Sequence, residues 1–324
     1  CTNLGRVELV SVFTYYGHIG YLAENGGKIR ATNGNNSYGN FGSVSEGIDL
    51  TEEYVNAYVN NRSYQAIIGN IIVDNNKIIA VEYTNAGRDY IPGNTTYEWS
   101  GDGYGITGTT AVVVTAGVMQ VRMTGDASTF GGADYITAGN TIQNGNATQV
   151  TLSNTDIAIS SAYVGMAIVL TSGKGAGQIA YVDTYNAGTK LATVKKPSDD
   201  TAGWDHMISG TAIETLLDNT TTYQIEPRVT FSAPAGDGST ATATAQGRAK
   251  VVDGKIIEVR IYNPGASYVS EPTVTFTDPN NTADAPHEVY LGDGVLTQPT
   301  FTDAGTGWTT VSATVLDSGE TKNI

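Results

Sequence analysis

The chain has 324 residues, 40% of them apolar, and this length and composition place it among globular proteins with room for two or three domains. Its formal net charge of −15 repels phosphate backbones and anionic membranes, so nucleic acid is not expected as a partner. The longest apolar stretch, 111–121, is interrupted by polar residues and is shorter than the roughly 20 residues of a membrane-spanning helix, so no membrane span is expected.

The composition favours an all-β protein built from many short strands. The chain holds 39 Gly and 19 Tyr and is rich in Thr, Asn, Val and Ile, while strong helix-forming runs are few. Residues 50–62 fit either a helix or a loop. The single cysteine, Cys1, excludes an intrachain disulfide framework, so stability must come from packing or assembly. A start at Cys1 favours a segment of a longer polypeptide over a processed mature form or a lipoprotein.

Residues 1–50 are expected to form a β-solenoid-like end segment, because short strand-like stretches alternate with turns. Residues 7–12 alternate in the manner of a strand, and 13–22 and 26–31 follow in the same style. Asn33-Gly34, directly after these stretches, is a strong turn signal.

Beyond this segment, four copies of a short phrase, Gly-x-x-aromatic, are spaced at a regular interval. The first two copies start 45 residues apart and the last two 40 residues apart, with a gap of about three such steps between them. Self-similarity at this period predicts small repeated supersecondary units rather than one enzyme core. The Gly and aromatic positions are Gly87 and Tyr90, Gly132 and Tyr135, Gly265 and Tyr268, and Gly305 and Trp308.

The flanks of the phrase repeat too. Strand-like segments precede three copies, at 77–81, 117–123 and 255–259, and a Pro-led Val-Thr-Phe segment at 272–279 echoes one at 227–234. The predicted unit is therefore a strand, an Asn-x-Gly-x-x-Tyr turn and a Pro-led strand, because Asn and Gly supply the positive-φ positions of a tight turn. A repeated aromatic most simply packs across its turn, so a structural role is favoured over ligand binding for these Tyr residues.

The predicted fold is thus all-β and elongated, with tandem small β-modules: a β-solenoid end plus sandwich-like or barrel-like repeats. The expected modules are 1–50 (solenoid-like end), 51–123 (first repeat), 124–226 (an inserted β-module that leaves the pattern), 227–284 (repeat) and 285–324 (C-terminal repeat).

The sequence shows no strong signal for catalysis, a cofactor or a metal. The glycine run 173–177 matches no phosphate-binding pattern and is expected to be a hairpin turn. No two of the three histidines, at 18, 206 and 287, have metal-ligand spacing, and no usual nucleophile arrangement occurs. A carboxylate pair brought together from distant strands stays open, although the adjacent pairs 52–53 and 199–200 do not provide one. The expected assignment is no enzyme, no cofactor and no metal.

Aromatic side chains offer flat surfaces for sugar rings. Trp99, Trp204 and Trp308 are the candidate glycan contacts, with packing inside thin β-modules as the competing role.

Three phrases of the chain resemble structural proteins of tailed bacteriophages, especially T4-like phages of cyanobacteria. Residues 27–47 are similar to a segment that follows a β-helix in such proteins, and parts of 175–206 are similar to another module of tail and baseplate proteins. The Asn-x-Gly-x-x-Tyr unit with its Pro-led strand occurs in the same setting. The resemblance covers most of the chain and implies a fibre, spike or baseplate component, commonly homotrimeric, with Cys1 inside a longer polypeptide. It supplies no catalytic residues.

We therefore expect a non-enzymatic virion structural protein of a phage tail, fibre or baseplate. Its expected roles are assembly with itself, as a homotrimer, and with other virion proteins, and attachment to a cell-surface polysaccharide. Two alternatives stay open: a bacterial extracellular filament or surface-layer subunit, which would share the composition, and a glycan-degrading tailspike.

Overall fold

The computed structural model describes residues 1, 5–24, 27–45, 65–124, 139–235, 243–252, 254–278 and 285–317. Every regular element in these residues is a β-strand, so the all-β prediction is confirmed for them. The undecided helix or loop at 50–62 and the second Gly-x-x-aromatic copy, at 132–135, lie outside the described residues. None of the described segments forms a helix that is long and apolar enough to cross a membrane. The chain divides into two compact units, Cys1–Gln65 and Ala66–Ile324.

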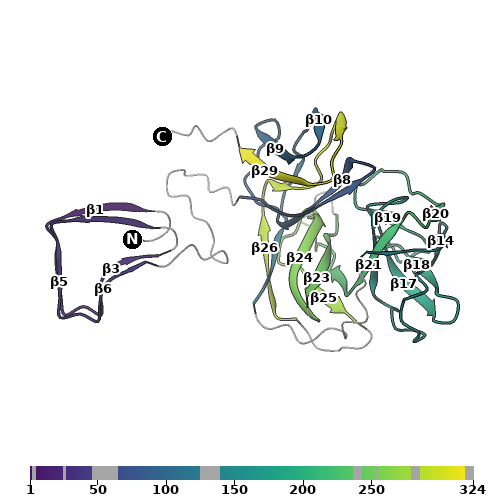
Figure 1. Cartoon of the computed structure of the whole chain (residues 1–324), viewed down its shortest axis with the longest axis horizontal. Helices are drawn as coiled ribbons and strands as arrows, with labels where there is room; N and C mark the ends of the chain where they lie inside the picture. Colours follow the sequence, from purple (N-terminus) through teal and green to yellow (C-terminus); the bar gives the residue numbers. More distant parts are fainter. Residues whose placement is uncertain are drawn as a thin grey trace. The chain divides into compact units, whose positions relative to one another are not determined.

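The first unit contains three parallel strand pairs. Its strands are β1 (Arg6–Val10), β2 (Phe13–Tyr15), β3 (Ile19–Ala23), β4 (Lys28–Thr32), β5 (Asn35–Ser37) and β6 (Phe41–Ser45). β1 pairs with β4, β2 with β5 and β3 with β6, and in each pair the facing residues are 22 positions apart, as Arg6 is from Lys28. The chain therefore passes twice over the same three sides, drawn in purple in Figure 1.

The corners of this unit repeat at the same interval. Ser11 and Asn33 both have a φ of 54°, and Tyr16 and Tyr38 both have a φ of 60°. The two tyrosine rings stack, with centroids 5.0 Å apart and planes 14° from parallel. Left-handed backbone is uncommon for a bulky residue, so its recurrence 22 residues later marks a repeated corner.

Little of the first unit is buried. Ala23 is the one buried hydrophobic residue among its described residues, and several large apolar side chains are exposed instead. These are Val7, Val10, Phe13, Tyr15, Tyr16, Tyr38 and Phe41. The described part of this unit therefore lacks a core of its own.

The second unit is built around a six-stranded sheet. Its order is β23, β24, β8, β12 and β26, and β7 also pairs with β8. The strands are β7 (Ile67–Asp74), β8 (Lys77–Asn85), β12 (Gly117–Met123), β23 (Gln246–Val252), β24 (Lys255–Asn263) and β26 (His287–Gly292). In β24 the buried Ile256 lies between the exposed Lys255 and Ile257, as expected where one face of the sheet packs on a core.

Two antiparallel hairpins form the centre of this sheet. β7 pairs with β8, β23 pairs with β24, and the second strands of the two hairpins are neighbours, with Ile261 facing Tyr83. β8 and β24 are the two strand-like segments that precede the first and third Gly-x-x-aromatic copies. The first and third copies of the sequence phrase therefore follow two equivalent hairpins of the same sheet.

Four two-stranded ladders complete this part of the unit. They pair β9 (Thr95–Gly101) with β29 (Val311–Asp317), β10 (Tyr104–Thr107) with β28 (Asp303–Thr306), β11 (Val113–Val114) with β27 (Val295–Leu296), and β22 (Arg228–Phe231) with β25 (Val274–Thr277). The two Pro-led segments thus pair with each other. Because strands from 51–123, 227–284 and 285–324 alternate in these sheets, the boundaries between those modules stay predictions.

A nine-stranded sheet occupies the region of the predicted insertion, 124–226. It contains β13 (Asn140–Thr141), β14 (Asn144–Gly145), β15 (Gln149–Thr151), β16 (Ala167–Ser172), β17 (Gln178–Asn186), β18 (Leu191–Lys195), β19 (Asp205–His206), β20 (Leu217–Asp218) and β21 (Thr222–Glu226). Its core includes Leu152, Tyr163, Ile168, Trp204 and Tyr223, all at most 2% exposed. Residues 173–177 connect the antiparallel strands β16 and β17, a hairpin as predicted.

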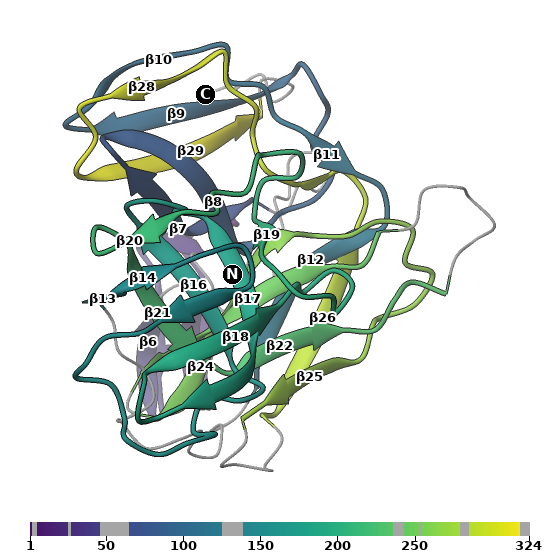
Figure 2. The same ribbon diagram turned by 90° about the vertical axis from the view of Figure 1, so that its right-hand side faces the viewer.

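The two large sheets share a buried cluster. Ile72, Ala80 and Tyr262 come from the six-stranded sheet, and Val169, Ala176, Ile179 and Met207 come from the nine-stranded sheet or its loops. Figure 2 labels strands of both sheets. This packing matters for the site, because it holds loops of both sheets around one hollow.

Candidate functional site

The Gly-x-x-aromatic copies that are described share one turn geometry. The side-chain Oδ1 of Asn85 accepts a hydrogen bond from the Gly87 amide at 2.8 Å, and Asn263 and Gly265 repeat this contact at 2.9 Å. Asp303 does the same for Gly305, also at 2.9 Å. The three glycines have φ values of 66°, 65° and 74°, a region that favours glycine.

In the first and third copies, the tyrosine also caps the start of a neighbouring strand. The Tyr90 hydroxyl accepts a hydrogen bond from the Ala66 amide at 2.7 Å, directly before β7. The Tyr268 hydroxyl accepts one from the Ala245 amide at 2.9 Å, directly before β23, and donates to the Ser232 carbonyl at 3.2 Å. Each tyrosine thus joins the turn after a hairpin to the start of that hairpin.

The third position of the phrase also has left-handed backbone. Asp89 and Ser267 have φ values of 63° and 65°, and in the last copy this position is a glycine, Gly307, with a φ of 80°. The last copy ends in Trp308, which is 4% exposed. The repeated residues Gly87, Tyr90, Gly265, Tyr268, Gly305 and Trp308 therefore all take part in the backbone geometry of turns.

The three tryptophans named as candidate glycan contacts differ in exposure. Trp204 is 2% and Trp308 is 4% exposed, whereas Trp99 is partly exposed and stacks on Tyr97 with ring centroids 5.6 Å apart. Stacking on a sugar needs an accessible ring face, so Trp99 has the largest free surface of the three. Trp204 instead lines a groove, and its Nε1 donates to the Asn146 carbonyl at 3.2 Å.

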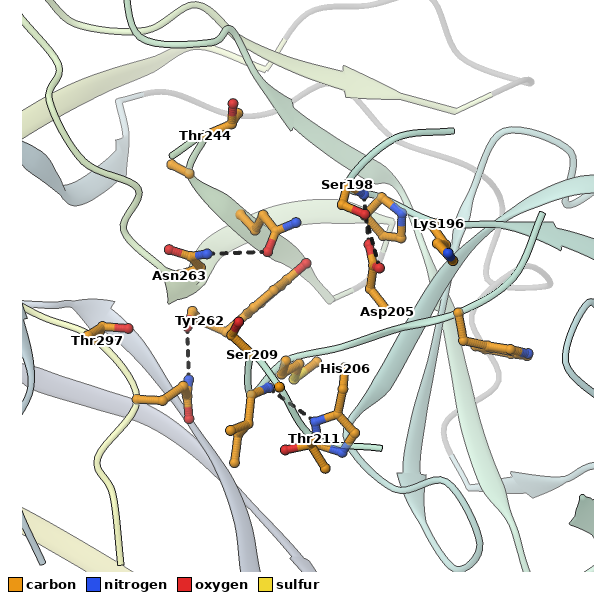
Figure 3. Close-up of a pocket in the computed structure, with 18 of the residues that line it drawn as sticks. Lys196, Ser198, Asp205, His206, Ser209, Thr211, Thr244, Tyr262, Asn263 and Thr297 are labelled. Carbon is orange, nitrogen blue, oxygen red and sulfur yellow. Dashed lines mark hydrogen bonds between the residues drawn. The ribbon is translucent and has the colours of Figure 1, made fainter. Parts of the chain in front are cut away.

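This groove lies among the described residues and has a volume of about 950 Å³. Residues 196–198, 204–211 and 213, in β19 and in loops of the nine-stranded sheet, line one side. The other side comes from β22, β23, β24 and the loop 297–300. In Figure 3, Thr244 and Asn263 lie on one side of the groove, and Lys196, Ser198 and Asp205 lie on the other. Small-molecule sites commonly have volumes of roughly 300–1,000 Å³, so this groove is large enough for a ligand.

Much of the lining is polar but uncharged. The hydroxyls of Ser209, Thr211 and Thr244 are exposed and make no hydrogen bond within the described part of the chain. The Asn263 Nδ2 lies 3.5 Å from the Gln246 Oε1, a long contact. Hydrogen-bonding capacity is therefore available along the groove.

The charged groups of the groove are few. The Asp205 carboxylate accepts from the Ser198 amide at 2.7 Å and from the Ser198 hydroxyl at 3.0 Å. The Arg228 guanidinium lies 3.8 Å above the Tyr181 ring and 3.4 Å from the Asp200 carboxylate. Burial raises the pKa of the Tyr181 hydroxyl. Lys196 makes no salt bridge within the described residues.

His206 has a structural role at the groove floor. Its Nδ1 accepts a hydrogen bond from the Ile208 amide at 3.1 Å, which holds the 205–208 loop. Burial lowers its pKa, so the ring is neutral near pH 7. The other histidines contact aromatic rings: His18 meets Phe41, and His287 meets Phe276, both edge-on.

A buried ionic network links the two large sheets. The Arg248 Nε lies 2.9 Å from a Glu82 carboxylate oxygen and 3.6 Å from one of Glu226. Arg248 and Glu82 belong to the six-stranded sheet, whereas Glu226 ends β21 of the nine-stranded sheet. Burial raises the pKa of Glu226 to about 7, against the lowering effect of Arg248. These carboxylates do not line the groove.

Catalytic and metal-binding arrangements are not evident in the described residues. Among the described residues that line the groove, Asp205 is the one carboxylate, whereas glycan hydrolysis by the usual route needs two. Within those residues no group of three or more His, Cys, Asp or Glu side chains could hold a metal ion. At the glycine run, the Gly173 amide donates to the Asp74 carboxylate, so this amide already has an anionic partner within the chain.

Comparisons of the chain with protein-family models, with curated proteins and with solved structures found no match.

The groove was not predicted from the sequence. Its lining comes from separated segments, and Trp204 and His206 are the lining residues that the sequence marks as candidate ligand contacts. One usable signal was Asn263, which belongs to the repeated turn phrase and also reaches the groove.

Proposed function

We propose that this chain is a non-enzymatic structural component of a tailed-phage particle, in a fibre, spike or baseplate. In this role it assembles with copies of itself and with other virion proteins, outside the host cell, and it contributes to attachment to a host-surface polysaccharide. The resemblance of 27–47 and 175–206 to such proteins supports the proposal, and so does the all-β fold.

The first unit is the observation that carries this proposal. Three parallel pairs with one 22-residue offset are what two successive coils of a three-sided β-solenoid would present. Solenoid coils bury their side chains against neighbouring coils or neighbouring chains. The exposed Phe13, Tyr15 and Phe41 are therefore surfaces that assembly would cover.

We assign that assembly to a homotrimer. A three-sided unit with little core gains most when its exposed apolar side chains are buried between copies. The threefold state itself follows from the resemblance to tail fibres and spikes, in which trimers are common.

The second unit fits a supporting role. Its repeated turns use their tyrosines to cap strands, and its two large sheets share one buried cluster and one buried ionic network. Such contacts stabilise a rigid body that can present a surface at a fixed position.

The two alternative functions make different predictions. A bacterial filament or surface-layer subunit would have the same exposed coils, so its position on a particle or cell decides between them. A glycan-degrading spike needs a second carboxylate near the sugar, and the groove's described lining supplies only Asp205.

Immunogold electron microscopy of the native source material tests the proposal. An antibody to this chain should label tailed particles at their fibres or baseplate. Label along free filaments or on cell envelopes would contradict it and would favour the extracellular structural class.

A further inference from the structure

We propose that the groove between the nine-stranded sheet and the second repeated hairpin is a binding site for a saccharide chain. This inference rests on the proposed function for its biological setting, but its geometry stands independently. It places glycan attachment in the groove. Of the three tryptophans that are candidate glycan contacts, Trp204 lines the groove and Trp99 and Trp308 do not.

An asymmetry between two equivalent hairpins is the first argument. The hairpins β7–β8 and β23–β24 carry the same turn, with Asn85 and Asn263 in the same position and with the same contact to a glycine amide. The groove lining includes residues of the second hairpin and its turn, such as Gln246, but none from 66–90. The loops of the nine-stranded sheet therefore enclose this groove beside the second copy, and its described lining includes no residue of the first copy.

Asn263 has two separate tasks in this arrangement. Its Oδ1 is occupied by the Gly265 amide at 2.9 Å and holds the turn. Its Nδ2 faces the groove and lies 3.5 Å from the Gln246 Oε1, a long hydrogen bond that is drawn as a dashed line in Figure 3. An amide group has two N–H donors, so at least one remains available to an oxygen of a ligand.

The lining matches the chemistry of a saccharide. Sugar rings present many hydroxyls, each both donor and acceptor, together with small apolar patches of C–H groups. The groove offers the free hydroxyls of Ser209, Thr211 and Thr244, and the accepting carboxylate of Asp205. Apolar surface comes from Phe231, Ile208 and Pro299. A drug-like apolar ligand would cover the three hydroxyls without giving them hydrogen-bond partners, which is unfavourable.

Charge makes the site distinct from the rest of the surface. The whole chain carries −15, whereas the described groove lining holds Lys196, Arg228 and Asp205, with the Arg228 guanidinium 3.4 Å from the Asp200 carboxylate and with His206 neutral. Acidic sugars are therefore less strongly repelled here than elsewhere, and Lys196 has no salt bridge to break within the described residues. Both neutral and acidic saccharides share the hydroxyl chemistry, and binding of the two kinds must be compared.

A pair of isosteric substitutions tests the assignment. Asn263→Asp keeps an oxygen for the Gly265 amide but removes the N–H donors. Asn85→Asp makes the same change of charge and shape in the equivalent turn, outside the groove. Asp303 shows that an aspartate supports this turn, since it accepts from Gly305 at 2.9 Å. Both variants are therefore expected to fold.

The measurement uses the full chain and an immobilised panel of purified neutral and uronate-containing bacterial surface polysaccharides. Oligosaccharides released from the binding members are then titrated calorimetrically. We expect wild type and Asn85→Asp to bind equally, and Asn263→Asp to bind about fivefold more weakly, the usual effect of one lost hydrogen bond. Ser209→Trp places a large ring in the groove from an exposed loop position and should abolish binding.

Two results would overturn the site. One is that no member of the panel binds wild type, and the other is that Asn263→Asp and Ser209→Trp bind as wild type does. Binding of only neutral members would keep the site and remove the role of Lys196. The particle labelled by the antibody is a separate result, so the function and the groove can fail independently.

Discussion

Removing the hydroxyl of Tyr268 should destabilise the second unit substantially. Tyr268 is 4% exposed, and its hydroxyl accepts from the amide of Ala245, which is 2% exposed. In Tyr268→Phe that buried N–H has no partner, which costs about 1–3 kcal/mol, while the Ser232 carbonyl belongs to an exposed residue and can bind water. We therefore expect a loss of about 2 kcal/mol in the free energy of unfolding, or roughly 4–8 °C in Tm.

Denaturant unfolding followed by tryptophan fluorescence suits this test, because all three tryptophans lie in the unit Ala66–Ile324. Tyr104→Phe is the matched control, since Tyr104 is 71% exposed and its hydroxyl makes no hydrogen bond within the described residues. It should change stability by less than about 0.5 kcal/mol. If Tyr268→Phe were as stable as Tyr104→Phe, the capping role of the repeated tyrosine would be refuted.

Two further predictions concern the turn and the ionic network. Gly265→Ala should cost more than 2 kcal/mol, on the order of the largest backbone effects, because its Cβ would lie 2.5 Å from the Ala243 carbonyl oxygen at a φ of 65°. Gly93→Ala has a φ of 85° but open space, so its smaller loss in the same unfolding assay isolates the steric part, and equal losses would contradict the close approach. Burial raises the pKa of Glu226 from 4.5 to about 7, so the folded state holds a proton that the unfolded chain releases, and this contribution to stability is lost as pH rises from 4.5 to 7. Glu226→Gln, neutral throughout, should gain stability relative to wild type as pH rises across this range, whereas parallel pH profiles would show that Glu226 does not titrate there.

The repeated turns were accessible from the sequence because their chemistry is local. Asn or Asp two residues before a glycine, with an aromatic three residues after it, specifies the side-chain contact and the left-handed backbone. The capping of Ala66 by Tyr90 was not accessible, because it joins residues 24 positions apart. The second copy, at 132–135, lies outside the described residues and stays a prediction.

The 22-residue period of the first unit was not predicted from the sequence, although a few residues recur at this interval. Tyr16-Gly17 and Gly20 recur as Tyr38-Gly39 and Gly42, but most other positions differ between the two passes. Parallel pairing is set by register over a long separation rather than by local propensity. The repeated corners, at which Tyr16 and Tyr38 have left-handed backbone, are therefore recognised only when the pairing of the strands is known.

The groove could not be predicted because no single segment specifies it. Thr244, Asn263 and Asp205 come together only when the two large sheets pack through Tyr262 and Met207. A single sequence contains each residue but not their distances.

The mass of the purified chain in solution, measured by light scattering, tests the assembly claim most directly. A homotrimer would have a mass of about 102 kDa, three times the 34.0 kDa of one chain. The account predicts that mass, and predicts that replacing Phe13 and Phe41 by Ser reduces it toward one chain. A stable 34.0 kDa monomer with a reversible two-state melt would contradict it.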